Sequence, residues 1–121
     1  DHPVFNQSSP RFEIDFAGQN YIEEIARART FGFMQEVEMM RQHGLGLGGN
    51  LTNAIVIDDV DILNPDGLRY PDEFVRHKIL DILGDLFLVG HLKGHIIAVK
   101  SSHNLNSRLS REILKEMQEE A

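Results

Sequence analysis

Asp72-Glu-Phe-Val-Arg-His-Lys-Ile-Leu-Asp-Ile-Leu-Gly-Asp-Leu-Phe-Leu88 is the stretch that decides how this sequence folds. Its apolar residues recur at i, i+4, i+7, i+8 and i+11, which predicts one buried stripe along a helix. These residues are Val75, Ile79, Ile82, Leu83 and Leu86. His77, Asp81 and Asp85 recur every four residues on roughly the opposite side, so groups that bind metals or transfer protons share a helix face. We expect one face to pack and the other to be available for chemistry.

The polar face allows two interpretations. A His and an Asp four residues apart on a helix often form a solvated pair that contributes about 0.2–0.5 kcal/mol. Alternatively, His103 at a predicted strand-to-helix junction could join His77 and Asp81. That set supplies the two His and one carboxylate of a hydrolytic zinc site or a non-haem iron site. A His at a helix start is also commonly a surface residue or a cap, and spacing alone does not decide between these possibilities.

Composition limits the classes of protein to consider. A chain of 121 residues is long enough for one core and predicts a single domain, residues 1–121. Its 12 Lys and Arg against 19 Asp and Glu give a formal charge of −7, which disfavours nucleic acid or an anionic membrane as partner. The sequence has no Cys, so any metal must be bound by His and carboxylate. No apolar run approaches the ~20 residues that cross a bilayer, and no signal peptide is expected.

Strict alternation predicts a half-buried strand at residues 11–16, short apolar runs predict further strands, and apolar residues at helical spacing predict helices between them. The expected strands are residues 11–16, 54–57 and 95–99, with residues 62–64 as the hairpin partner of 54–57. The expected helices are residues 34–43, 72–88 and 105–117, and a short one that Asn20 caps at Tyr21. Residues 26–33 are interpreted as a linking segment because Gly32 weakens a helix there. The predicted class is α+β, a small and mainly antiparallel sheet with helices packed on one face.

Further residues could take part in a reaction or line a ligand site. Lys78 could stabilise an oxyanion, and Thr30 could donate a hydrogen bond to one, although surface roles are common for both residue types. Phe31, Phe33 and Met34 could line an apolar groove, but most clusters of this kind are core.

Several motifs, in their order and spacing, resemble the C-terminal half of the UDP-3-O-acyl-N-acetylglucosamine deacetylase (LpxC) family. The resemblance extends from about Asp1 to Arg111. The motifs are Ala28-Arg-Thr-Phe-Gly-Phe33 with Glu36, Leu45-Gly-Leu-Gly-Gly49 before Asn53-Ala-Ile-Val56, Leu63-Asn64 with Gly67-Leu-Arg69, Asp72-Glu-Phe-Val-Arg-His-Lys78 with Asp81 and Gly84-Asp-Leu86, and Lys100-Ser-Ser-His103 with Leu105-Asn106.

The resemblance implies a cytoplasmic, Zn²⁺-dependent hydrolase that removes an acetyl group from UDP-3-O-acyl-N-acetylglucosamine in lipid A biosynthesis in Gram-negative bacteria. It maps the zinc ligands onto His77 and Asp81. It gives His103 the role of a charged acid that stabilises the transition state, with Asp85 orienting it, and this differs from the metal-binding role that spacing suggests. Thr30 would help to hold the oxyanion, and Lys78 would lie beside the same site.

The resemblance also implies a passage for the acyl chain of the substrate. The residues assigned to it are Phe31, Phe33, Met34, Val37, Gly46, Gly49, Asn50 and Ala54. Small residues such as glycine leave room for a lipid chain, because they carry little or no side chain.

In this family the third zinc ligand and a Glu general base lie in an N-terminal domain. The resemblance therefore implies that this chain is a truncated second domain of a two-domain α+β deacetylase, carrying half of the active site. On that interpretation the chain alone is expected to be inactive, and the missing domain is a required partner. An alternative is a non-catalytic module that binds the acyl group without turnover.

Overall fold

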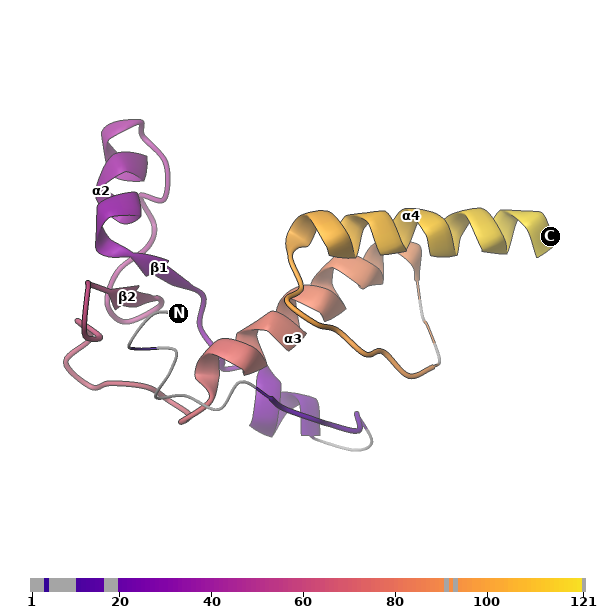
Figure 1. The fold of residues 1–121 in the computed structure, drawn as a ribbon, viewed down its shortest axis with the longest axis horizontal. Helices are drawn as coiled ribbons and strands as arrows, with labels where there is room; N and C mark the ends of the chain where they lie inside the picture. The colour runs from indigo at the N-terminus through magenta and orange to yellow at the C-terminus, as the bar shows by residue number, and fades with distance from the viewer. Residues whose placement is uncertain (1–3, 5–10, 17–19, 91, 93, 121) are drawn as a thin grey trace. The chain divides into compact units, whose positions relative to one another are not determined.

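The computed structural model describes residues 4, 11–16, 20–90, 92 and 94–120. Its contacts divide the chain into two compact units, Asp1–His77 and Lys78–Ala121, and the boundary falls inside a helix. Figure 1 shows the elements in chain order by colour. They are η1 (Tyr21–Ile25), β1 (Phe31–Phe33), α2 (Met34–Gln42), β2 (Ile55–Ile57), α3 (Glu73–Leu86), η2 (Phe87–Val89) and α4 (His103–Glu120).

The first unit contains a two-stranded parallel sheet, in which Phe31 of β1 lies opposite Ile55 of β2. The chain passes from β1 to β2 through α2, as Figure 1 shows. Parallel neighbours need such a crossover, since a tight hairpin reverses the chain direction. The prediction of a mainly antiparallel sheet is therefore wrong. Residues 26–33, interpreted as a linker, include β1, whose alternation of Phe, Gly and Phe is too short to reveal a strand by its period.

The core of the first unit surrounds this sheet. Ile55 and Ile57 are fully buried and cluster with Val4 and Phe74. Phe31, Phe33, Ile62 and Leu68 are partly buried and pack against them. The rings of Phe31 and Phe74 meet edge to face with centroids 5.1 Å apart, the arrangement that the ring quadrupoles favour. Since Phe74 belongs to the first turn of α3, the sheet and the start of this helix share one core.

The strand predicted at 54–57 is confirmed as β2, but its hairpin partner at 62–64 is reduced to one antiparallel bridge between Ile57 and Ile62. The buried side chain of Asn64 replaces the missing backbone partners. Its Oδ1 accepts a hydrogen bond from Val56 N at 2.9 Å, and its Nδ2 donates to Ala54 O at 2.7 Å. One side-chain amide therefore provides hydrogen-bond partners for backbone groups of Ala54 and Val56, since buried polar groups need such partners.

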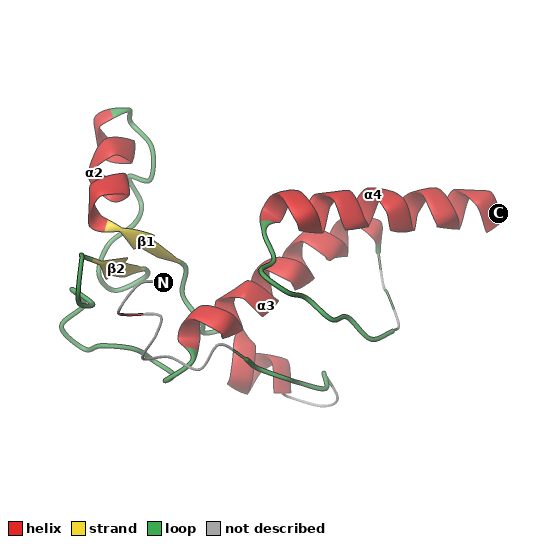
Figure 2. Cartoon of the chain, in the orientation of Figure 1, coloured by secondary structure: helices red, strands yellow, loops and turns green. Residues whose placement is uncertain are grey.

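The strands predicted at 11–16 and 95–99 are wrong, since both segments are irregular in Figure 2. The first segment alternates and the second is an apolar run, but a strand also needs a neighbouring strand to pair with. Among the described residues neither segment has one. Ile97 and Val99 consequently remain 82% and 78% exposed.

The predicted helices are present, with shifted ends. α2 ends before Gly44, whose φ of +73° suits a left-handed helix end. α3 continues into η2 and stops at Gly90, which has φ +95°. α4 begins at His103, two residues earlier than expected, because Ser102 Oγ accepts a hydrogen bond from Leu105 N at 3.1 Å. Within the described residues no helix is long and apolar enough to cross a membrane.

The short helix expected at Tyr21 forms as the π-helix η1, but the prediction that Asn20 caps it is wrong. Asn20 makes no capping hydrogen bond and has helical backbone angles itself. Its side-chain amide instead donates to Asp15 O at 2.7 Å. A capping side chain accepts from the first free N–H groups, and Asn20 uses its donor instead.

Candidate active site

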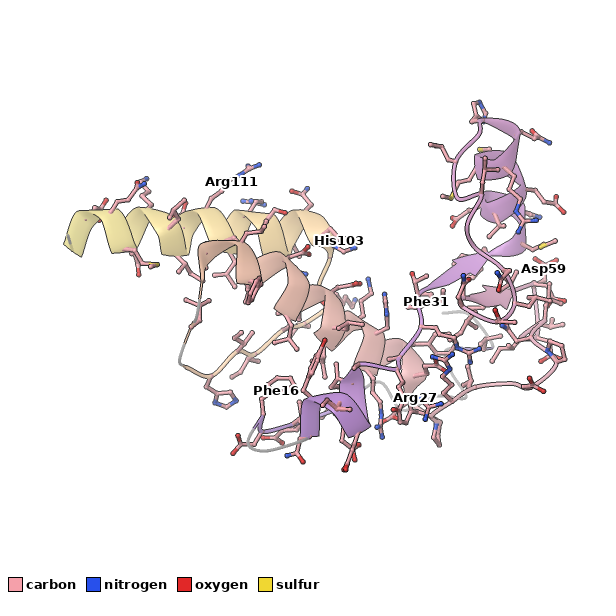
Figure 3. All side chains as sticks on the ribbon, turned by 180° about the vertical axis from the view of Figure 1, so that it is seen from behind. Phe16, Arg27, Phe31, Asp59, His103 and Arg111 are labelled. Atoms are coloured by element: carbon pink, nitrogen blue, oxygen red, sulfur yellow. The ribbon has the colours of Figure 1, made fainter. Side chains whose placement is uncertain are left out.

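His103 and two carboxylates of α3 form a cluster in the second unit. His103 opens α4 (Figure 3), and its Nδ1 lies 2.7 Å from Asp85 Oδ2. Its Nε2 lies 3.8 Å from Asp81 Oδ2. A carboxylate can only accept a hydrogen bond, so Nδ1 carries the hydrogen. Two carboxylates one helical turn apart therefore face the two nitrogens of one imidazole.

The charges of this cluster favour a protonated His103. The hydrogen bond to Asp85 raises the pKa of His103 above its ordinary value, and the negative charges of Asp81 and Asp85 add to this effect. Burial tends to raise the pKa of Asp85, but hydrogen bonds from Asn106 and His103 outweigh burial and lower it. Both shifts favour the ion pair of a protonated His103 with an ionised Asp85. The His103 side chain is 71% exposed, so its ring can contact a molecule from solvent.

Asn106 and Ser110, which the sequence interpretation did not single out for this role, hold Asp85 in place. Asn106 Nδ2 donates to the same Asp85 oxygen that His103 binds, at 3.0 Å. Ser110 Oγ lies 3.0 Å from the backbone oxygen of Asp85. Both side chains are buried, each 6% exposed. The available signal was spacing, since Asn106 follows His103 by three residues and Ser110 follows Asn106 by four, which places them along one side of α4.

His77 is held by the backbone of the first unit. Its Nδ1 lies 3.0 Å from Ala28 O, and a carbonyl only accepts, so Nδ1 donates. A ring anchored in this manner presents Nε2 as its ligand nitrogen, which is how zinc-binding His residues are usually oriented. Asp81 follows one turn later in α3, so the two donors on the helix are of the types that zinc takes. Among the residues that the structure describes, no three His, Asp or Glu side chains are grouped to hold a metal ion.

Thr30 lies next to β1 in the sequence, and Lys78 lies in α3. Thr30 is exposed and directly precedes β1, where its carbonyl accepts a hydrogen bond from Ile55 N at 2.8 Å. The backbone of Thr30 is therefore fixed by its pairing with β2. Lys78 is half-buried in α3 and adjoins His77 in sequence.

The residues assigned to an acyl passage lie on β1, on α2 and in the loop that follows it. Phe31 and Phe33 contribute to the core of the first unit and are only partly buried. Met34 is 37% exposed, and Val37 is half-buried beside Gly32. The core interpretation therefore holds in part for both phenylalanines, since they pack against the core and keep some exposure, and the acyl passage stays a prediction.

Gly46, Gly49, Asn50 and Ala54 lie in the loop between α2 and β2, which side-chain amides shape. Asn50 N donates to Asn53 Oδ1 at 2.8 Å, and Gly46 has φ +64°. Large apolar side chains of α2 and this loop are exposed, namely Met39 and Met40 of α2 and Leu45, Leu47 and Leu51 of the loop. Apolar side chains exposed on a helix and on the glycine-rich loop after it are available to contact an apolar ligand.

A buried ion pair between Arg29 and Glu73 was missed by the sequence interpretation. Glu73 is fully buried, and its Oε2 lies 2.9 Å from Arg29 Nε. Burial tends to raise the pKa of Glu73, but the hydrogen bonds from Arg29 and Arg69 together outweigh burial and lower it. The two residues lie far apart in sequence. No local pattern indicates that Glu73, in the first turn of α3, pairs with Arg29 and not with another Arg of the chain.

Comparison with known proteins gives one consistent result. The family model for UDP-3-O-acyl N-acetylglycosamine deacetylase (LpxC) matches residues 1–115. Proteins named UDP-3-O-acyl-N-acetylglucosamine deacetylase are 72% identical in Neisseria meningitidis serogroup C over 115 residues and 59% identical in Chromobacterium violaceum over 120 residues. These alignments cover 94% and 95% of this chain but 38% of each relative.

Proposed function

The chain belongs to the UDP-3-O-acyl N-acetylglycosamine deacetylase (LpxC) family, and from this premise we propose that it carries half of the active site of a zinc-dependent deacetylase. The substrate would be UDP-3-O-acyl-N-acetylglucosamine, and the reaction a cytosolic step of lipid A synthesis. The His103–Asp85 pair beside Asp81 is the observation that carries this proposal. The chain spans 38% of the relatives it matches, so the remaining groups would come from elsewhere in the protein.

His103 would act as the acid of the reaction. Hydrolysis of an N-acetyl group passes through a tetrahedral oxyanion, and the amine must gain a proton to leave. An imidazolium aligned by Asp85 through Nδ1 keeps Nε2–H for this purpose. Its positive charge also stabilises the oxyanion. Thr30 would donate a further hydrogen bond to the oxyanion, and Lys78 would add positive charge.

His77 and Asp81 would hold the zinc ion. The anchored ring of His77 and a carboxylate one turn later provide two donors of suitable type. Bound zinc would polarise the acetyl carbonyl and lower the pKa of a water molecule to about 7. The third protein ligand and the general base are proposed to come from an N-terminal domain.

The acyl chain of the substrate would lie against the segment from β1 to β2. Exposed apolar side chains on α2 and its loop provide the contact surface, and the glycines keep it open. The alternative function, a module that binds the acyl group without turnover, uses this surface alone. It predicts that substrate binding survives the loss of His103.

Replacement of the matching segment of the N. meningitidis relative by residues 1–115 of this chain would test the proposal, with acetate release from the UDP-linked substrate as the assay. We expect the chimera to be active and His103→Ala to lower kcat by about 10²- to 10⁴-fold, the usual contribution of general acid–base catalysis. His95→Ala, at another exposed histidine, serves as the control and should keep its rate. Unchanged kcat in His103→Ala would refute the role of His103, and binding without any turnover in the chimera would favour the module.

A further inference from the structure

The peptide group between Ala28 and Arg29 is held at both ends by one turn of α3. Glu73 Oε2 accepts a hydrogen bond from Arg29 N at 2.9 Å. The carbonyl oxygen of the same peptide group, Ala28 O, accepts from His77 Nδ1 at 3.0 Å. Glu73 and His77 are four residues apart in α3, so they lie on the same side of the helix.

A peptide group is planar, and its N–H and C=O point in opposite directions. Fixing the N–H end therefore fixes the direction in which the carbonyl points. Since that carbonyl is the partner of His77 Nδ1, its direction sets the position and the tautomer of the imidazole. A small rotation of the peptide plane would remove the acceptor from Nδ1 and allow the hydrogen to move to Nε2.

Glu73 is well suited to hold the N–H end. Its side chain is fully buried, and both oxygens have two donors each. Oε2 accepts from Arg29 N and Arg29 Nε, each at 2.9 Å. Oε1 accepts from Arg29 Nη2 at 3.1 Å and from Arg69 N at 2.7 Å. A buried carboxylate with four donors is held in one orientation, because any movement leaves donors unsatisfied.

We propose that Glu73, with Arg29, is a positioning residue that sets the ring of His77 through the Ala28–Arg29 peptide group. The pair does not touch substrate or metal in this scheme. It holds the ring in the Nδ1–H form and so presents Nε2 as a metal ligand. The last part rests on the proposed function, in which His77 binds zinc, whereas the effect on the tautomer does not.

The first arm of the test is metal-free and uses the full chain. Long-range ¹H–¹⁵N NMR spectra at pH 8 report which ring nitrogen of His77 carries the hydrogen. Wild type should show the Nδ1–H form, and an Nε2–H form would overturn the proposal without any variant.

The second arm compares two matched double variants. Arg29→Met with Glu73→Leu removes the acceptor of the Arg29 N–H without leaving a buried charge, and should populate the Nε2–H form of His77. Asp72→Leu with Arg76→Met likewise replaces an acid by Leu and an Arg by Met, at a neighbouring ion pair in which Arg76 Nε lies 2.6 Å from Asp72 Oδ1. The side chains of this pair do not bond the Ala28–Arg29 peptide group, so His77 should keep the Nδ1–H form. Glu73→Gln keeps an acceptor oxygen and should also preserve it. A folded Arg29→Met/Glu73→Leu variant with an unchanged tautomer would refute the proposal. If that variant does not fold, Glu73→Asp withdraws the acceptor by one methylene and is expected to shift the tautomer in its place.

The third arm measures zinc affinity in the N. meningitidis chimera carrying residues 1–115. Loss of the Glu73 acceptor should weaken zinc binding about 10- to 100-fold, the usual effect of removing an outer partner of a metal-binding His, while Asp72→Leu/Arg76→Met should leave it unchanged. Equal affinity in all variants would overturn the metal-orienting role. A wild-type chimera that binds no zinc, together with the expected tautomer shift, would refute the proposed function and not the positioning by Glu73.

Discussion

Arg29→Met should destabilise the first unit strongly, because it leaves the carboxylate of Glu73 buried without its counter-charge. The side chain of Arg29 supplies Nε at 2.9 Å and Nη2 at 3.1 Å to this carboxylate, and Nη2 also donates to Gly67 O at 2.9 Å. Two backbone donors, Arg29 N and Arg69 N, remain after the substitution. Breaking a buried ion pair usually costs about 3–5 kcal/mol. Since half of the donors persist, we expect Arg29→Met to lower the free energy of unfolding by about 3 kcal/mol at pH 7.

The stability that Arg29→Met loses relative to wild type should become smaller as the pH falls. In the wild type the pKa of Glu73 is lowered, so its contribution to stability is present above the unfolded pKa and is lost as the pH falls through the folded pKa. In Arg29→Met burial dominates and raises the pKa of Glu73. Protonation at lower pH then removes the buried charge. The difference between wild type and variant should therefore shrink as the pH decreases toward 4.

Urea unfolding followed by circular dichroism at several pH values measures both effects. The double variant Arg29→Met/Glu73→Gln has no buried charge and keeps an acceptor oxygen, so it should recover most of the stability that Arg29→Met loses. A loss below about 1 kcal/mol at pH 7 in Arg29→Met, or a deficit that grows as the pH falls, would refute this reasoning.

Three further predictions concern the sheet, the loop and the His103 cluster. Ile57→Ala should cost about 2–5 kcal/mol in urea unfolding, because Ile57 is fully buried in the core of the first unit, and a loss under 1 kcal/mol would contradict that burial. Gly46→Val should destabilise the loop, because Gly46 has φ +64° and a Cβ there would lie 3.3 Å from Met40 Cε; a Tm equal to wild type would contradict the strain. Asp85→Asn should lower the pKa of His103 in an NMR titration, since Asp85 is the largest cause of its elevation. In wild type, the stability that the raised pKa of His103 contributes is present below the unfolded pKa and disappears as the pH rises through the folded pKa. An unchanged pKa of His103 in Asp85→Asn would exclude the effect of Asp85 on this pKa.

The helices could be predicted from sequence because their information is local. The stripe from Val75 to Leu86 identified α3, and Gly44 and Gly90 marked helix ends that the structure confirms. The start of α4 was predicted two residues too late, because the cap at Ser102 acts through one hydrogen bond and leaves no periodic pattern in the sequence.

The sheet could not be predicted in the same way, because strand pairing depends on distant partners. Residues 11–16 alternate as a strand would, yet among the described residues no neighbouring strand pairs with them. β1 has only three residues, and its parallel partner β2 begins beyond a whole helix and loop. The buried Arg29–Glu73 pair joins residues 44 positions apart, for which a single sequence gives no register.

The candidate site was predicted partly from spacing and partly from resemblance. Spacing placed His77, Asp81 and Asp85 on one side of α3 and suggested metal binding for His103, whereas the resemblance implied an acid oriented by Asp85. The structure places His103 Nδ1 2.7 Å from Asp85 Oδ2, and the two roles of His103 stay predictions. Asn106 and Glu73 are buried and make hydrogen bonds to residues distant in sequence. Such contacts become visible only once the elements are packed.

Calorimetric zinc titration of the N. meningitidis chimera carrying residues 1–115 tests the central claim most directly. The proposed ligands predict one tight zinc site per chain that is lost in both His77→Ala and Asp81→Ala and is kept in His103→Ala. Tight binding that survives His77→Ala and Asp81→Ala would contradict their assignment. Binding that disappears in His103→Ala as well would instead return His103 to the ligand role that its spacing first suggested.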